Sequence, residues 1–189
     1  MQKIGEKRGA VELSISTIVI VVLGVSMLIL GLVLIRTIFK GATSVAEMSD
    51  EQLKNQMNQL YGDTKKVSVY PDSKQITISL KDGIGAFGIG ITNSEGGSSS
   101  KLKYAYNVVV ADPDVSKKCN GATAEEMLGL ISVGKSGENI AIASGDSYIT
   151  KVRFTVGVGD PICLVRYAIQ ATVNGEVYGA EEMDVNFVA

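Results

Sequence analysis

The sequence predicts an α+β protein in which one long hydrophobic α-helix precedes an antiparallel β-sandwich. Residues 13–35 contain no charged side chain and are mostly apolar. From Lys66 onward, apolar residues instead recur at every second position and turn-forming residues separate the runs, which is the pattern of half-buried strands. We therefore expect a leader at residues 1–9, a long helix at residues 10–62, and a β-sandwich outer domain at residues 66–189.

The apolar run is long enough to cross a membrane. It reads LSISTIVIVVLGVSMLILGLVLI, and at a rise of about 1.5 Å per residue such a helix spans a hydrocarbon core of roughly 30 Å. A cleaved secretory signal has a shorter apolar core, of roughly 7 to 15 residues, with small residues close behind it. The nearest such site, Ser44-Val45-Ala46, lies well beyond the run, so we expect the mature protein to keep the helix. The basic residues before the run favour a cytoplasmic amino terminus and an outer domain outside the cell.

Small residues recur along this helix at a spacing of seven, at Ala10, Thr17, Gly24 and Gly31. A period of seven keeps side chains on one slowly drifting helix face, and small side chains on one face let another helix approach closely. Glu12 precedes the apolar run, where the helix dipole and the unpaired amides of a first turn favour a carboxylate. We expect Glu12, Thr17, Gly24 and Gly31 to serve assembly between helices.

An amphipathic neck follows at residues 42–61. Its apolar residues recur at three- and four-residue spacing, which favours a helix. Ser49 and Gln52 have the spacing of a capping box, which would begin a separate helix. We prefer one long helix, bent gently near Gly41, because no strong helix breaker lies in residues 40–50.

The outer domain is expected to consist of short strands joined by turns. Asn174-Gly175 is the strongest hairpin signal in the chain, and Thr123 with Glu126 predicts a capped short helix that ends at Leu130. Residues 94–100, rich in serine and glycine, are expected to form an exposed loop. Alternation predicts strands near residues 67–69, 76–80, 87–91, 102–110, 140–142, 148–158, 163–173 and 176–188. Seven or eight such strands are typical of an antiparallel sandwich.

The composition argues against an enzyme. The chain contains no histidine, and therefore lacks the usual acid–base group at neutral pH, the commonest metal ligand and any Ser-His arrangement. Past Gly41 the net charge is −5, from 13 Lys or Arg and 18 Asp or Glu, so nucleic acid is not an expected partner. Asp112 and Asp114, with Asp160, are candidates for weak calcium binding, but we prefer an ordinary Asp-Pro-Asp turn. We predict no catalytic residue, no cofactor and no metal site.

Cys119 and Cys163 are the two cysteines of the chain. In a domain outside the cytoplasm, such a pair predicts one disulfide; two buried free thiols are the alternative. A bridge that closes a loop of about 43 residues contributes roughly 4 kcal/mol in the chain-entropy model.

The start of the chain resembles a known class of filament subunits. The leader ends in Lys7-Arg8-Gly9, and Ala10 follows directly; this resembles the class III signal peptide of archaeal type IV filament subunits, the archaeal pilins and archaellins. Residues 14–20, SISTIVI, are similar to the start of archaellin helices. The resemblance implies that a prepilin-type signal peptidase recognises Arg8, Gly9 and Ala10 and cuts between Gly9 and Ala10.

The resemblance also implies a structural role in an archaeal type IV-like surface filament, a pilus rather than an archaellum, with adhesion as one use. The precursor would wait in the cell membrane with its N-terminus in the cytoplasm. After cleavage, its apolar helix would join copies of itself in an extracellular helical filament. The outer domain is similar in layout to immunoglobulin-like modules of archaeal surface proteins. The alternative is a single-span, membrane-anchored extracellular immunoglobulin-like binding protein, which has no use for Lys-Arg-Gly directly before a small residue.

Overall fold

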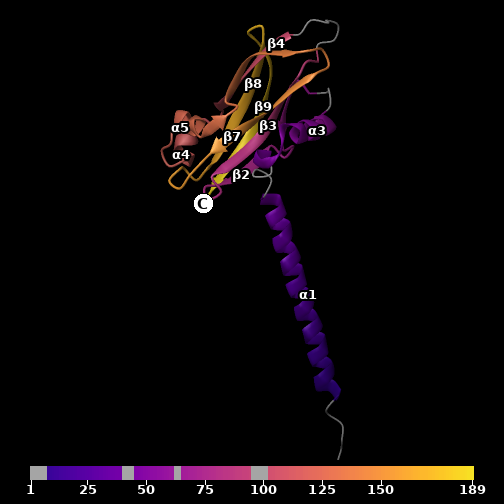
Figure 1. The fold of residues 1–189 in the computed structure, drawn as a ribbon. Coiled ribbons are helices and arrows are strands. Elements are labelled where there is room, and N and C mark those ends of the chain that lie inside the picture. Colours follow the sequence, from indigo (N-terminus) through magenta and orange to yellow (C-terminus); the bar gives the residue numbers. More distant parts are fainter. Residues whose placement is uncertain (1–7, 40–44, 62–64, 95–101) are drawn as a thin grey trace, which may run out of the picture. The chain divides into compact units, whose positions relative to one another are not determined.

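The computed structural model describes residues 8–39, 45–61, 65–94 and 102–189, and within the first of these ranges it describes side chains at residues 17–33. The chain divides into two compact units, residues 1–40 and residues 41–189. The first unit holds the helix α1 (Arg8–Phe39), which has 32 residues. The second holds the strands and the shorter helices (Figure 1).

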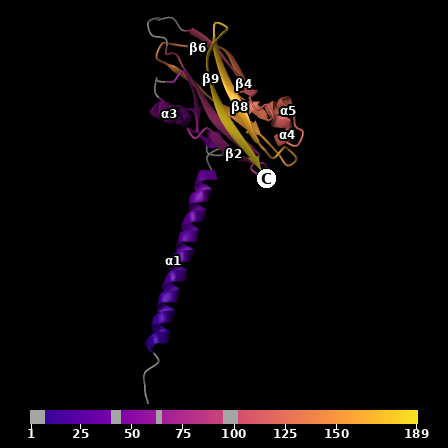
Figure 2. The same ribbon diagram turned by 180° about the vertical axis from the view of Figure 1, so that it is seen from behind.

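Within the described residues, nine strands form two sheets (Figures 1 and 2). The four-stranded sheet has the order β1-β3-β7-β5, and the five-stranded sheet has the order β2-β9-β8-β4-β6. The strands are β1 (Val67–Tyr70), β2 (Gln75–Ser79), β3 (Ile84–Thr92), β4 (Leu102–Val110), β5 (Ile131–Val133), β6 (Ser136–Ile142), β7 (Ser147–Thr155), β8 (Leu164–Val173) and β9 (Glu176–Val188).

One strand pair corrects the expectation of a wholly antiparallel sandwich. Strands β2 and β9 run parallel, with Gln75 opposite Asp184 and Ser79 opposite Val188, whereas the other pairs in the described residues are antiparallel. Parallel neighbours need a long connection, and here most of the outer domain lies between the two strands. The five-stranded sheet is therefore mixed, the four-stranded sheet is antiparallel, and the fold is sandwich-like.

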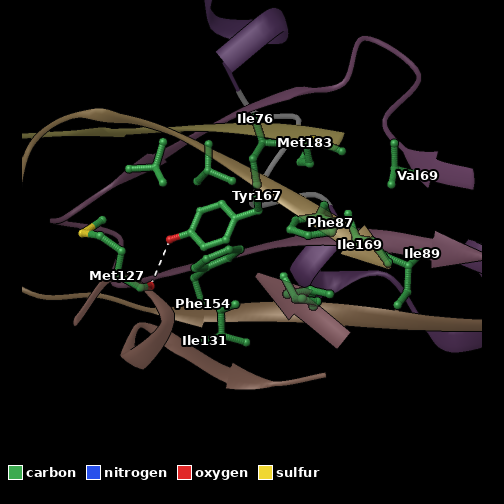
Figure 3. Packing of buried hydrophobic residues seen from close by; sticks show 14 of the residues in the cluster. Val69, Ile76, Phe87, Ile89, Met127, Ile131, Phe154, Tyr167, Ile169 and Met183 are labelled. Atoms are coloured by element: carbon green, nitrogen blue, oxygen red, sulfur yellow. Dashed lines mark hydrogen bonds between the residues drawn. The ribbon is translucent and has the colours of Figure 1, made fainter. Parts of the chain in front are cut away.

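The core lies between the two sheets. Phe154 of β7 meets Tyr167 of β8 with ring centroids 5.3 Å apart, and meets Phe187 of β9 at 5.9 Å. The hydroxyl of Tyr167 is buried, and it donates a hydrogen bond of 3.0 Å to the carbonyl of Met127 (Figure 3). That carbonyl belongs to the helix α5 (Ala124–Gly129), so α5 is tied to the core. The aromatic contacts bridge the two sheets and fix them face to face.

Strand β3 is buried on both faces. On the side of the core, Phe87, Ile89 and Ile91 are fully buried, and a Cβ added at Gly85 would lie 2.5 Å from the Ile78 side chain. The other face carries small residues, and the helix α3 (Asp50–Tyr61) covers them. A Cβ at Gly88 would lie 2.8 Å from Leu53 of that helix. Glycine in β3 thus serves close packing, as expected where another backbone approaches a strand.

The neck is interrupted, which corrects the prediction of one continuous helix. A short helical turn at residues 45–47 is followed by two non-helical residues, Met48 and Ser49, and α3 then begins at Asp50. The capping box is present: Gln52 N–H donates to the Ser49 hydroxyl at 3.2 Å, and Ser49 N–H donates to the Gln52 side chain at 3.0 Å. The proposed bend near Gly41 and the end of the helix at residue 62 lie outside the described residues.

The remaining local predictions are largely confirmed. Thr123 and Glu126 form the capping box of α5, and Asn174 and Gly175 have φ values of 52° and 85° in the β8–β9 turn, as a hairpin turn of this type requires. Two elements were not predicted, the strand β5 and the helix α4 (Val115–Lys118). Most of the predicted loop at 94–100 lies outside the described residues.

Candidate assembly surfaces

The helix α1 is apolar on every side of its described part. Large apolar side chains from Ile18 to Val33 are between 51% and 74% exposed, and they occupy successive positions, so no face of the helix is polar. A helix that is apolar all round is normally covered by protein or lipid. Among residues described with their side chains, no helix combines the length and hydropathy that a membrane span requires.

The predicted small-residue positions lie on one face of α1. Thr17, Gly24 and Gly31 follow one another at seven-residue spacing, a period that drifts by only about 20° per repeat on a straight helix. A Cβ added at Gly24 or Gly31 would meet nothing within 4 Å. Ser26 lies on another side of the helix, and its hydroxyl donates to the Val22 carbonyl at 2.7 Å. The small-residue face is therefore open and flat enough for a second helix.

The predicted leader site falls at the start of α1. Arg8, Gly9 and Ala10 are its first three residues, and Glu12 follows within the next turn; their side chains lie outside the described residues. The first turn of a helix lacks intrahelical partners for its N–H groups, so it frays easily. The predicted cut between Gly9 and Ala10 stays a prediction.

The neck, residues 45–61 of the structure, is packed onto the outer face of the four-stranded sheet. Leu53, Met57 and Tyr61 of α3 are buried against Ala86 of β3. At the end of α3, the Tyr61 hydroxyl donates to the Val69 carbonyl at 2.5 Å and contacts Asp72 at 3.1 Å. Burial, with the Asp72 hydrogen bond and charge second, raises the pKa of Tyr61 well above its usual range. That hydroxyl therefore stays protonated and continues to donate.

Two basic side chains of β7 hold the other end of the neck. Lys151 donates to the Met48 carbonyl and also lies 3.1 Å from a carboxylate oxygen of Asp50. Arg153 donates to the Ala46 carbonyl at 3.4 Å. Carbonyls at the end of a helical turn carry partial negative charge, which cations stabilise. The neck is thus held at both ends and packed in the middle.

The predicted disulfide is present. Cys119, which follows α4, is bonded to Cys163, which precedes β8. Both cysteines are buried. Beside the bridge, Asn120, Met127, Asp160 and other residues line an open groove of about 920 Å³. The disulfide therefore joins the α4–α5 segment to the loop that leads into β8.

The aspartates considered for calcium instead make local contacts. Asp112 accepts from Lys118 at 2.7 Å and from the Asp114 N–H at 3.0 Å, and Asp114 accepts from Lys117 at 2.8 Å. Asp160 accepts the Gly157 N–H at 2.8 Å. In the described residues, no group of three or more acidic or cysteine side chains could hold a metal ion.

The perturbed titratable groups have structural causes. Burial raises the pKa of Tyr106 to about 12, and burial also raises the pKa of Tyr167. The hydrogen bond from Lys118 lowers the pKa of Asp112, and hydrogen bonds from Thr123 lower that of Glu126. Each shift keeps the group in its ordinary protonation state at neutral pH. None creates an activated nucleophile or base.

Comparison with known proteins yields no family. No protein-family model matches the chain, and no curated protein matches it. Among solved structures, a Niemann-Pick type C2 protein from Japanese carpenter ant is similar with a TM-score of 0.39 and 11% identity, covering 65% of this chain and 89% of that one. The ASH/PapD-like domain 7 of human CEP192 is similar with a TM-score of 0.36 and 12% identity, covering 66% and 84%.

A third similar structure is much longer than this chain. It is the Pseudomonas fluorescens alkylpurine DNA glycosylase AlkC bound to DNA containing an abasic site analog, with a TM-score of 0.30 and 16% identity. The match covers 64% of this chain and 30% of that one. With such low scores and identities, none of these proteins carries a functional argument for this chain.

Proposed function

We propose that this chain is a structural subunit of an archaeal type IV-like surface filament, a pilus rather than an archaellum, which polymerises through α1. The observation that carries the proposal is the exposed, predominantly apolar surface of α1 over residues 18–33. Such a surface requires a cover, and copies of the same helix supply one with matching chemistry. The face of Thr17, Gly24 and Gly31 gives those copies a place for close approach.

The leader supports a route to that assembly. Before processing, the uncharged run at residues 13–35 would hold the precursor in the membrane with its basic leader in the cytoplasm. A prepilin-type signal peptidase would cut between Gly9 and Ala10, within the first turn of α1. The helix would then exchange lipid contacts for helix contacts at modest net cost, because both surroundings are apolar. Glu12 would pair with the free amine of a neighbouring copy.

The outer domain would form the surface of the filament. We propose that this domain is an immunoglobulin-like module, a two-sheet sandwich that contains the Cys119–Cys163 disulfide. Past Gly41 the chain has 13 basic and 18 acidic residues, which gives a net charge of −5. A disulfide suits an extracellular location, and acidic charge favours solubility. Adhesion would be a role of this surface.

Sequencing of the mature amino terminus tests the proposal directly. The full chain is expressed in an archaeal host that makes type IV-like filaments, and protein sheared from the cell surface is sequenced. We expect it to begin at Ala10 and to be filamentous by electron microscopy. Gly9→Leu should block processing and filaments, whereas Gly5→Leu, the same change elsewhere in the leader, should not. Mature surface protein that still begins at Met1 would refute the filament reading.

The second candidate is a permanent single-span anchor with an extracellular immunoglobulin-like binding domain. The length of the apolar run favours it as much as it favours the filament, since about 20 apolar residues suffice for a span. It predicts that Met1 is retained, that Gly9→Leu changes nothing, and that the protein stays in detergent-soluble membranes as single copies. The same sequencing experiment therefore separates the two.

A further inference from the structure

The neck packs in a hydrophobic cluster of its own. Val45, Leu53, Met57 and Tyr61 are buried together with Ala86 of β3. None of these residues belongs to the main core, which lies between the two sheets on the opposite face of β3. The four-stranded sheet therefore separates the two clusters, and α3 lies outside the sandwich (Figures 1 and 2). Because the neck shares no cluster residue with the core, it can leave its place as a separate unit.

The surface under α3 seats one face of the helix and leaves the other in water. The outer face of β3 carries small residues there, so α3 lies close to the strand. A Cβ added at Gly88 would lie 2.8 Å from Leu53, and one added at Gly90 would lie 3.1 Å from Met57. On the far side of α3, Leu60 is 55% exposed. The small residues of β3 cannot reach around α3, so they seat the helix without enclosing it.

The contacts that hold the neck follow one another along the chain. Near its start, Arg153 and Lys151 of β7 bind the carbonyls of Ala46 and Met48. The buried face of α3 comes next, and the hydrogen bond of the Tyr61 hydroxyl comes last. A pull that enters the neck from the chain before it therefore meets these contacts in order. Breaking contacts one at a time takes less force than breaking many of them side by side.

Beyond the neck, the same pull meets a larger packed unit. Strand β1 follows, and its Val67 and Val69 are buried in the main core. Strand β1 pairs with β3, which in turn pairs with β7 along its whole length. The main core contains many more buried residues than the cluster under α3, and the Cys119–Cys163 disulfide links two of its segments. The sandwich should therefore withstand a force that removes the neck.

We infer that the neck is a strap, which tension on the chain before it pulls away from β3 while the sandwich stays folded, and which docks again when the tension falls. The inference goes beyond the proposed function, because it holds equally for a chain fixed in a filament and for one fixed in a membrane. Fully extended at about 3.5 Å per residue, residues 45–61 span about 60 Å. Docked, α3 spans about 18 Å. Release therefore lengthens the tether of the outer domain by about 25 to 60 Å.

Pulling on single molecules of the full chain in detergent tests the strap. Handles are attached through azide-bearing phenylalanine analogues, one at Lys40 and one at Gln170, an exposed position in β8. We expect a first, reversible step of about 25 to 60 Å, followed at higher force by the larger step of the sandwich. With the first handle moved to Lys65, beyond the neck, the first step should vanish.

Two results of the pulling experiment would overturn the inference. One is a first step that remains when the handle is at Lys65, because the step would then come from the sandwich. The other is the absence of any step before the sandwich unfolds when the handle is at Lys40. Neither result depends on processing of the leader or on filaments, so a failure of the proposed function is distinguishable from a failure of the strap.

A matched pair of leucine substitutions assigns the step to the packing of α3. Leu53 is 1% exposed and Leu60 is 55% exposed. With handles at Lys40 and Gln170, Leu53→Ala should lower the force of the first step or remove the step, because it empties the contact over Gly88. The force of the sandwich step should stay unchanged, since the neck has already left when the sandwich opens. Leu60→Ala should change neither step. Equal forces for the first step in both variants would overturn the inference.

Discussion

Gly134 occupies a turn where a side chain cannot fit. It has a φ of +79°, and a Cβ there would overlap the carbonyl oxygen of Lys151. Gly145 has the same φ of +79°, but a Cβ added there would meet nothing within 4 Å. A side chain at Gly145 would therefore meet backbone strain alone, whereas a side chain at Gly134 would meet the same strain and a steric overlap as well.

Substitution of each glycine by alanine should expose the difference. We expect Gly145→Ala to cost about 1 kcal/mol, the penalty of a left-handed backbone for a residue with a Cβ. Gly134→Ala should cost about 3 kcal/mol or more, since overpacking adds to the same penalty. Urea unfolding of the full chain in detergent measures both, and equal costs would contradict the overlap with β7.

Asp112 makes the stability of the chain depend on pH in the acid range. Its partner Lys118 lowers its pKa from the ordinary value of 3.8, so its ion pair stabilises the fold above that value and is lost as pH falls through the lower folded-state pKa. Asp112→Asn should cost under about 1 kcal/mol at neutral pH, because Lys118 is half exposed and water screens the pair. The difference in free energy of unfolding between Asp112→Asn and the natural chain should disappear as the pH falls below 3.8. A gap that persists at lower pH, measured by urea unfolding, would assign the cost to packing instead.

At the scale of elements, α3 is held chiefly by its buried face. Leu53 is 1% exposed and Leu60, seven residues later on the same helix, is 55% exposed. We expect Leu53→Ala to cost about 2 to 4 kcal/mol through lost burial and a cavity over Gly88. Leu60→Ala should cost less than about 0.5 kcal/mol. Thermal unfolding followed by circular dichroism compares the two, and a similar cost for both would mean that α3 does not pack on β3.

The neck also shows where sequence patterns compete. The sequence contains both an apolar spacing of three and four residues and a capping box at Ser49. The spacing predicts one continuous helix, whereas the capping box predicts a separate helix that begins after Ser49. The box prevails because Lys151 and Arg153 bind the carbonyls of Met48 and Ala46, contacts from a strand about a hundred residues away. Local spacing cannot reveal such long-range partners.

The glycines of β3 were likewise visible in the sequence but not interpretable alone. Alternation at Phe87, Ile89 and Ile91 predicted a strand with one buried face, and that face is the core. The role of Gly88 depends on α3, which lies over it. The periodicity of a strand does not reveal which element covers it. The short β5 and α4 were missed for a related reason, because elements of three or four residues carry too few positions for a period.

On the scale of the whole molecule, the sequence predicts the individual elements better than the contacts between elements that are far apart in the chain. The apolar run, the sandwich and the disulfide follow from charge, period and cysteine number. The parallel β2–β9 pair does not, because it depends on sheet topology. The exposure of Val158 does not either, because it depends on which apolar residues the fold leaves uncovered. Val158 lies in a run of alternating apolar residues, yet it is 94% exposed, whereas Val156, two residues earlier, is 6% exposed.

The small-residue face of α1 yields the last prediction, on assembly. If copies of α1 pack through Thr17, Gly24 and Gly31, a large side chain on that face keeps the helices apart and removes their closest contacts. Gly24→Leu or Gly31→Leu should therefore abolish filaments, without changing the outer domain's unfolding. Ser26→Leu adds similar bulk at roughly 200° from Gly24 around the helix, and should leave filaments in place. Electron microscopy of sheared surface protein gives the answer: filaments from Gly24→Leu and Gly31→Leu would show that this face is not the packing seam.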